Sequence, residues 1–63
     1  MVDLRVTKLN DGRVRIEPAS LAGTLFVSEG GERVLVIEPA CAEFILRRAD
    51  EVGLEIYHEE VAL

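Results

Sequence analysis

The sequence contains few of the residues that stabilise small domains by cross-linking. Its 63 residues include one cysteine, Cys41, and one histidine, His58. A single cysteine excludes an intrachain disulfide, and one Cys with one His cannot supply the four ligands of a structural zinc site. A chain this short buries only about 60% of its unfolded surface. Its stability must therefore come from an efficient core or from self-association.

Long apolar runs and a basic excess are also missing. No run approaches the roughly 18 apolar residues of a membrane span, and residues 1–6 lack the basic start and apolar stretch of a signal peptide. With a lone cysteine, these features indicate a cytoplasmic protein that does not associate with membranes. Seven Lys and Arg against twelve Asp and Glu give a net charge of −5. This acidity argues against nucleic-acid binding and suits a basic protein partner or simple solubility.

Amide side chains are scarce as well. The chain has no Gln, its only Asn is Asn10, and six of its seven basic residues are Arg. Few thermolabile amides fit a thermophilic source, whereas the Arg bias fits a GC-rich genome equally well. The 49% hydrophobic content is too high for a disordered chain, so we expect one folded domain over residues 1–63.

Alternating apolar and polar residues predict an N-terminal hairpin. Residues 2–7 and 13–17 both have the period of half-buried strands, and Asn10-Asp11-Gly12 between them is a strong turn signal. Further strands are expected at 24–27, 33–37 and 54–58, with a turn at 28–32. The run 33–37 carries bulky side chains on both faces, which predicts a strand buried on both sides.

One helix is expected from Pro39 to about Val52, with Gly53 as its C-cap. Phe44 projects about 60° outside the apolar face of this helix. Residues 18–23 fit a single helical turn or an irregular link. The predicted fold is α+β, with a small, mostly antiparallel sheet of four or five strands in the order β-β-β-β-α-β and one helix on one face. The residues expected on the apolar helix face are Cys41, Ala42, Ile45, Leu46, Ala49 and Val52.

A short motif occurs twice. Glu17-Pro18-Ala19 and Glu38-Pro39-Ala40 each follow an apolar run, which reflects either a duplicated strand–helix–strand unit or chance. The two glutamates could bind a divalent cation or act in acid–base chemistry. We prefer the simpler explanation that negative charge suits the start of a helix.

Other chemically active side chains also have structural explanations that we prefer. Cys41 lies in the first helical turn, where thiols can be reactive, but its place on the apolar face predicts a buried small hydrophobe. His58 shares strand parity with Leu54 and Ile56, which predicts a partly buried, hydrogen-bonded histidine. Gly30-Gly31 lacks the spacing of a phosphate loop. The sequence therefore predicts no catalytic group, metal or cofactor.

The sequence also predicts surfaces through which the protein binds a second copy of itself or another protein. With bulky side chains on both faces of the sheet and a single helix, one face needs cover, so we expect a homodimer or a higher oligomer. Phe44, Leu35 and Ile37 are the expected contacts. Glu55 and Glu59 belong to an acidic group with Asp50, Glu51 and Glu60 that either attracts a basic partner or is an ordinary solvated face.

The leading functional expectation is a non-enzymatic protein-binding or regulatory module, because the chain is too short for a deep cleft and lacks a nucleophile constellation. The alternative is a small oligomeric enzyme or anionic-ligand-binding protein with its site at a subunit interface. Arg13 and Arg15, on one strand face, would then recognise carboxylate or phosphate. Nucleic-acid binding through these arginines is least favoured because the chain is acidic and has only three aromatic residues for base stacking.

Overall fold

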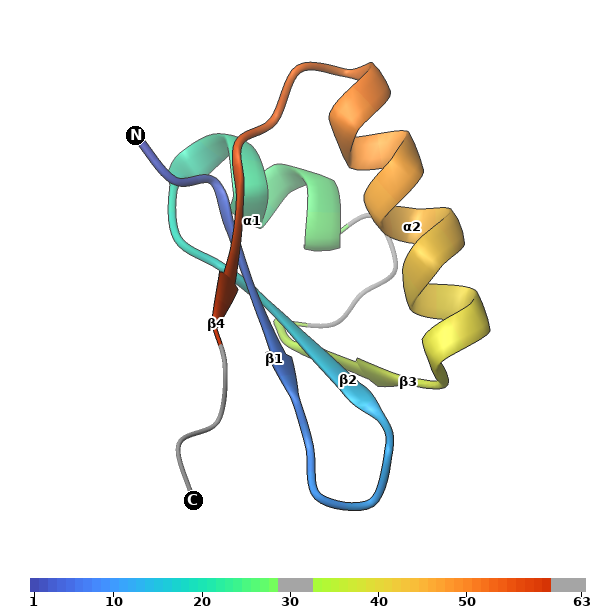
Figure 1. The fold of residues 1–63 in the computed structure, drawn as a ribbon. Helices are drawn as coiled ribbons and strands as arrows, with labels where there is room; N and C mark the ends of the chain where they lie inside the picture. Colours follow the sequence, from blue (N-terminus) through green and yellow to red (C-terminus); the bar gives the residue numbers. More distant parts are fainter. Residues whose placement is uncertain (29–32, 60–63) are drawn as a thin grey trace.

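A four-stranded mixed sheet and two helices make up the structure, a computed structural model that describes residues 1–28 and 33–59. The strand order is β3-β2-β1-β4 (Figure 1). β2 is antiparallel to both β1 and β3, whereas β4 is parallel to β1. The predicted α+β class is thus confirmed. In chain order the elements are β1 (Leu4–Lys8), β2 (Val14–Pro18), α1 (Leu21–Ser28), β3 (Leu35–Ile37), α2 (Pro39–Glu51) and β4 (Ile56–Glu59).

The β1–β2 hairpin forms as predicted. Its register pairs Leu4 with Pro18 and Lys8 with Val14. Gly12 has a φ of 90°, a conformation in the left-handed region that favours glycine. The Asp11 carboxylate accepts a hydrogen bond of 3.0 Å from the backbone N–H of Arg13. The turn residues therefore supply both the backbone freedom and the local hydrogen bond that the hairpin requires.

The strand predicted at residues 24–27 is wrong, because this segment lies in α1. Ser20 caps the helix: its Oγ accepts a hydrogen bond of 3.1 Å from the N–H of Gly23, and its carbonyl accepts one of 2.9 Å from the N–H of Thr24. Strand propensity depends strongly on context, and here an N-cap and burial of Val27 against the sheet override it. The order of elements is therefore β-β-α-β-α-β, with two helices instead of one.

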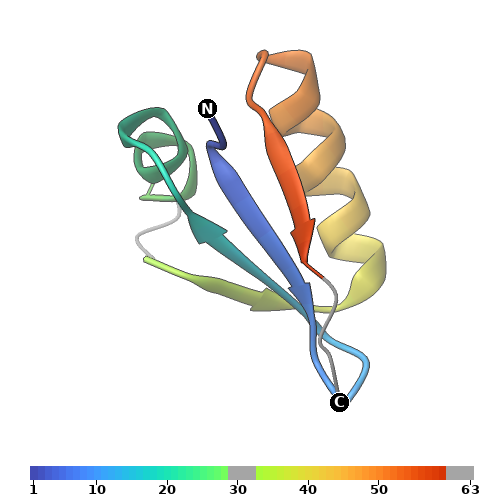
Figure 2. The same cartoon turned by 60° about the vertical axis from the view of Figure 1, so that its left-hand side comes forward.

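Both helices cover the same face of the sheet, so the molecule has two layers (Figure 2). Alternate residues of β1 and β2 point toward the helices, as the two-residue period of strands requires. Gly23 in α1 lies so close to the start of β1 that a Cβ atom there would overlap the carbonyl oxygen of Asp3. The buried core consists of Leu4, Val6, Val14, Ile16, Val27, Ala42 and Ala49.

The opposite face of the sheet is polar, which corrects the expected burial of residues 33–37 on both sides. The register places Arg5 beside Glu17 on this face, and Arg15 donates to the Glu17 carboxylate at 2.7 Å. β3 is a short edge strand whose Val36 is 42% exposed. A charged face is stable in water, so it needs no cover. This face therefore gives no reason to expect a covering second copy.

The two Glu-Pro-Ala motifs lie between a strand and a helix, but Glu17 and Pro18 belong to β2 whereas Pro39 and Ala40 belong to α2. Residues 17–19 and 38–40 each join a strand to the helix that follows. The first helix connects the neighbouring antiparallel strands β2 and β3, whereas α2 connects β3 to β4 at the opposite edge. Pro39 is the first residue of α2, a position that suits proline, whereas Pro18 is the last residue of β2 and α1 begins only at Leu21; neither the local role of the proline nor the strand arrangement repeats.

Helix α2 closely follows its predicted bounds, ending at Glu51 with Gly53 at a φ of 87°. Ala42 and Ala49 are buried, and Ile45 and Leu46 are partly buried. Cys41 and Val52 are exposed, which corrects their predicted burial. At about 100° per residue, Cys41 and Val52 lie on the margin of a stripe centred on Ala42 and Ala49. Among residues 1–28 and 33–59, no helix is long and apolar enough to cross a membrane.

Candidate functional site

A groove runs between α2 and the helix-facing side of the sheet. Its larger part, the hairpin-end hollow, has a volume of about 800 Å³. A second hollow of about 680 Å³ lies toward the end of α2 and shares Leu46 and His58 with the first. We call the two together the α2 groove. The hairpin-end hollow is lined by Val6, Lys8, Leu9, Asn10, Val14, Pro39, Ala42, Glu43, Leu46, His58 and Glu59.

The wall of the hairpin-end hollow is largely apolar. Val6 and Val14 come from neighbouring strands and face α2 because they share the inward parity of their strands. Ala42 and Leu46 are four residues apart on α2 and therefore lie on one face of the helix. The same patterns that build the core thus continue into an open, apolar groove.

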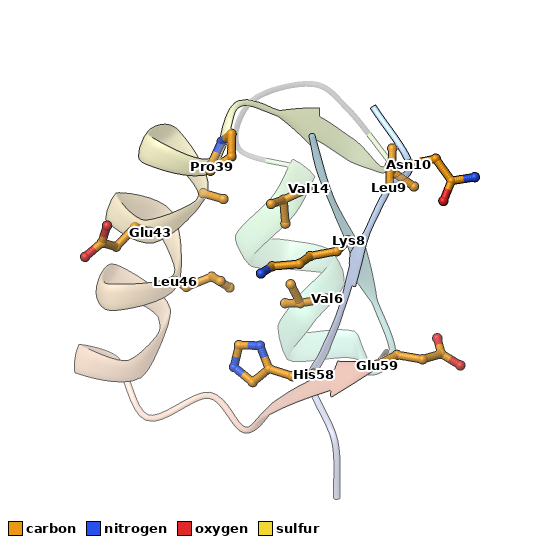
Figure 3. Close-up of a pocket in the computed structure, with 11 residues that line it drawn as sticks. Val6, Lys8, Leu9, Asn10, Val14, Pro39, Glu43, Leu46, His58 and Glu59 are labelled. Atoms are coloured by element: carbon orange, nitrogen blue, oxygen red, sulfur yellow. The ribbon is translucent and has the colours of Figure 1, made fainter. Parts of the chain in front are cut away.

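Two basic side chains point into this apolar space. Lys8 extends from β1 toward α2, and the ring of His58 points into the same space from β4 (Figure 3). Glu43 and Glu59 turn their carboxylates away from it (Figure 3). Glu43 also lies 3.8 Å from Arg47 in an ion pair. The interior of the hairpin-end hollow is therefore apolar with a positive charge, although the protein as a whole is acidic.

Lys8 differs from most of the basic residues in its electrostatic partners. It makes no ion pair with any residue in the described ranges, whereas five arginines do. Those pairs are Arg5–Glu17 at 3.9 Å, Arg13–Asp11 at 2.7 Å, Arg15–Glu17 at 2.7 Å, Arg47–Glu43 at 3.8 Å and Arg48–Glu51 at 3.7 Å. Arg13 and Arg15, the predicted anion-binding residues, are thus occupied by neighbouring carboxylates.

Lys8 is the residue that sequence reasoning missed. It has the same strand parity as Leu4 and Val6, so its position predicts a side chain directed toward the helices.

His58 has the predicted parity, with Val6 as its partner across β1 and β4. Its side chain is nevertheless exposed and makes no hydrogen bond within the described residues, which corrects the predicted partly buried, hydrogen-bonded histidine. The reason is that β4 is an edge strand and the groove leaves its end uncovered.

The residues predicted to contact partners are dispersed. Phe44 is 75% exposed on α2 and lies outside the groove lining. Leu35 and Ile37 are partly buried against the core under the helices. Glu55 pairs with the amino group of Met1 at 2.8 Å, and Glu59 lies at the margin of the groove. Of these residues predicted to contact partners, only Glu59 therefore lines the hairpin-end hollow.

The structure does not bring the paired glutamates of the repeated motif together. Val14 faces Ile37 in the β2–β3 register, so Glu38 follows the hairpin end of that pair and Glu17 lies near the other end of β2. Within the described ranges, no cluster of three or more His, Cys, Asp or Glu side chains could hold a metal ion. The preferred explanation, negative charge at the start of a helix, fits Glu38 at the N-cap of α2 and is wrong for Glu17, which lies in β2 and pairs with Arg5 and Arg15.

Asp3 forms a polar junction between β1, α1 and β4. Its carboxylate accepts hydrogen bonds from the Ser20 hydroxyl at 2.6 Å and from the Glu55 N–H at 2.9 Å. These bonds favour the ionised form and lower the pKa of Asp3 below its usual value of 3.8. Both partners belong to the scaffold, so the junction positions β4 and thereby one wall of the groove.

No family model matches this sequence, and comparison with curated proteins and with solved structures found no significant match. An open, elongated, mainly apolar surface with one strong positive charge is suited to binding.

Proposed function

We propose that this chain is a non-enzymatic protein-binding module, and that the α2 groove holds a short segment of a partner protein. The observation that carries the proposal is the pair of adjoining hollows along α2. Binding sites typically combine a concave, mostly apolar wall with a few polar groups, and the hairpin-end hollow has this composition.

The shape of the groove favours a peptide over a compact small molecule. Groove residues recur along the length of α2, from Pro39 through Leu46 to Asp50. At 1.5 Å per residue, this stretch of helix is about 17 Å long. An extended peptide rises about 3.3 Å per residue, so about five residues would span the groove. Pockets for alternate side chains give a bound extended peptide its specificity.

The other functional classes have less support. The hydroxyls of Ser20 and Thr24 are committed to Asp3 and to the backbone of α1, and Cys41 is not among the groove residues. An anionic-ligand site built on Arg13 and Arg15 would first have to displace their carboxylate partners. These observations favour a binding module over the alternative of an enzyme or ligand-binding protein at a subunit interface.

The proposal also includes self-association of the protein and a cytoplasmic location. Exposed apolar side chains on the helices offer a surface for a second copy, and Phe44 and Leu21 are 75% and 77% exposed. A free, exposed Cys41 suits the reducing cytoplasm. The thermophilic source stays a prediction from composition.

Selection from a random heptapeptide library displayed on phage tests the peptide-binding role. We expect enrichment over the starting pool, and the enriched peptides should shift the backbone NMR signals of Val6, Val14 and Leu46. Leu46→Trp should fill the groove and weaken binding at least tenfold. Phe44→Ser, two residues away but outside the groove, is the matched control and should bind normally.

Two outcomes would contradict the proposal. One is an absence of enrichment with wild-type protein that is folded by circular dichroism. The other is enrichment in which the NMR shifts map to the polar face of the sheet, around Arg5 and Arg15, and Leu46→Trp binds as well as wild type. If Leu46→Trp is unfolded, the NMR map alone decides between the two faces.

A further inference from the structure

We infer that the hairpin-end hollow selects a partner segment with one acidic side chain flanked by apolar residues. This inference rests on the proposed peptide-binding function and adds the chemistry of the bound segment. It follows from the juxtaposition of Lys8 and His58 over an apolar floor of Val6 and Val14.

Lys8 supplies the charge that a carboxylate would recognise. Its ammonium group lies over the groove and has no ion-pair partner within the described residues. A charged group beside an apolar wall is less screened than one surrounded by water, so an incoming carboxylate would interact with it more strongly than at a fully exposed site. The stem of Lys8 would meanwhile contact apolar side chains of the peptide.

His58 provides a second polar contact in the same space. Its imidazole can donate one hydrogen bond when neutral and two when protonated. The His58 ring points into the hollow from β4, and Lys8 points into it from β1, the strand next to β4 (Figure 3). A single carboxylate between them would accept hydrogen bonds from both residues, which a neutral side chain could do less well.

The far end of the groove limits how acidic the segment can be. Asp50 and Glu55 line the second hollow. Glu55 is paired with the Met1 amino group at 2.8 Å, but Asp50 makes no ion pair within the described ranges. A uniformly acidic peptide would be repelled there. One acidic residue at the hairpin end, followed by apolar residues, matches the charges of both hollows and also gives the peptide a direction.

The same heptapeptide selection tests this inference through the sequences that it enriches. We expect Asp or Glu to be enriched at one position, with apolar residues on either side. For a fluorescein-labelled enriched peptide, Lys8→Glu should weaken binding about tenfold in fluorescence anisotropy, and Lys8→Met about threefold. Wild-type affinity should fall as NaCl is raised from about 50 to 500 mM.

Arg5→Glu is the matched control. Arg5 belongs to the same strand, its substitution changes the net charge by the same amount, and it lies on the opposite face of the sheet. We expect less than a twofold effect on binding. Equal losses for Lys8→Glu and Arg5→Glu would show that only overall charge matters and would overturn the inference. Selected peptides without an acidic preference would overturn it too.

Failure of the inference can be distinguished from failure of the proposed function. No enrichment at all contradicts the peptide-binding role. Enrichment of purely apolar or basic peptides that still bind in the α2 groove keeps that role and refutes the acidic specificity. A protein whose groove signals shift with its own concentration, and whose solution mass doubles unless Lys8 is replaced, would show that a second copy occupies the groove and would also refute the inference.

Discussion

Replacing Gly23 with alanine should destabilise the protein, although the same change stabilises most helices. Gly23 lies inside α1 and is buried against the start of β1. An added Cβ would overlap the Asp3 carbonyl oxygen and would lie 2.9 Å from the carbonyl carbon and 3.3 Å from Leu4 Cδ2. The first two obstacles are backbone atoms, which cannot rotate away. Helix α1 must therefore move outward as a unit.

The magnitude follows from two opposing contributions. Alanine is favoured over glycine in a helix interior by about 1 kcal/mol. Overpacking against an immobile neighbour costs about 1–3 kcal/mol, and an outward shift of α1 also exposes Val27, which is now 2% exposed. Burial of a valine side chain contributes at least about 1.5 kcal/mol, part of which would be lost. We expect a net destabilisation of about 2 kcal/mol, which lowers the Tm by about 10 °C in a domain of this size.

Urea unfolding followed by circular dichroism at a fixed protein concentration measures this change. Thr24→Ala is the matched control, because Thr24 is the next residue of α1, is exposed, and loses only a local hydrogen bond to the Ser20 carbonyl. It should stay within about 0.5 kcal/mol of wild type. If Gly23→Ala is as stable as wild type or more stable, the close approach of α1 to β1 is wrong.

Two further predictions concern acid stability and self-association. The lowered pKa of Asp3 means that its ionised form stabilises the folded state above the usual value of 3.8, and this contribution is lost as the pH falls through the lower folded value. The free energy of unfolding should therefore fall more steeply between about pH 4 and pH 2 for wild type than for Asp3→Asn; equal slopes would exclude a role for this carboxylate. Phe44→Glu should lower the solution mass of any oligomer in light scattering, with Thr7→Glu on the polar face of the sheet as a charge-matched control. An oligomer unchanged by Phe44→Glu would move the interface elsewhere.

Local signals in the sequence were sufficient for several elements. Asn10-Asp11-Gly12 specifies its turn through residues that tolerate the required backbone conformations. Pro39 and Gly53 delimit α2 because one suits the first helical turn and the other a left-handed C-cap. These signals act over a few residues, so they do not depend on what packs against them.

The first helix and the groove were not predictable in the same way. Residues 24–27 have strand-forming side chains, yet Ser20 starts a helix that packs Val27 onto the sheet. For such a short segment, tertiary burial outweighs local propensity. The polar outer face was not expected, because only residues 35–37 form β3, an edge strand on which Val36 stays exposed.

The sequence alone determined the α+β class, the hairpin, the second helix and the inward parity of His58, because each depends on local turns or on the period of a strand or helix. Only the tertiary structure decided that β4 pairs in parallel with β1, that both helices share one face, and that Lys8 and His58 point into the same space beside α2. These features join residues about 50 positions apart. The pairing of distant segments depends on how the whole chain buries its apolar surface, and a local sequence pattern does not contain that information.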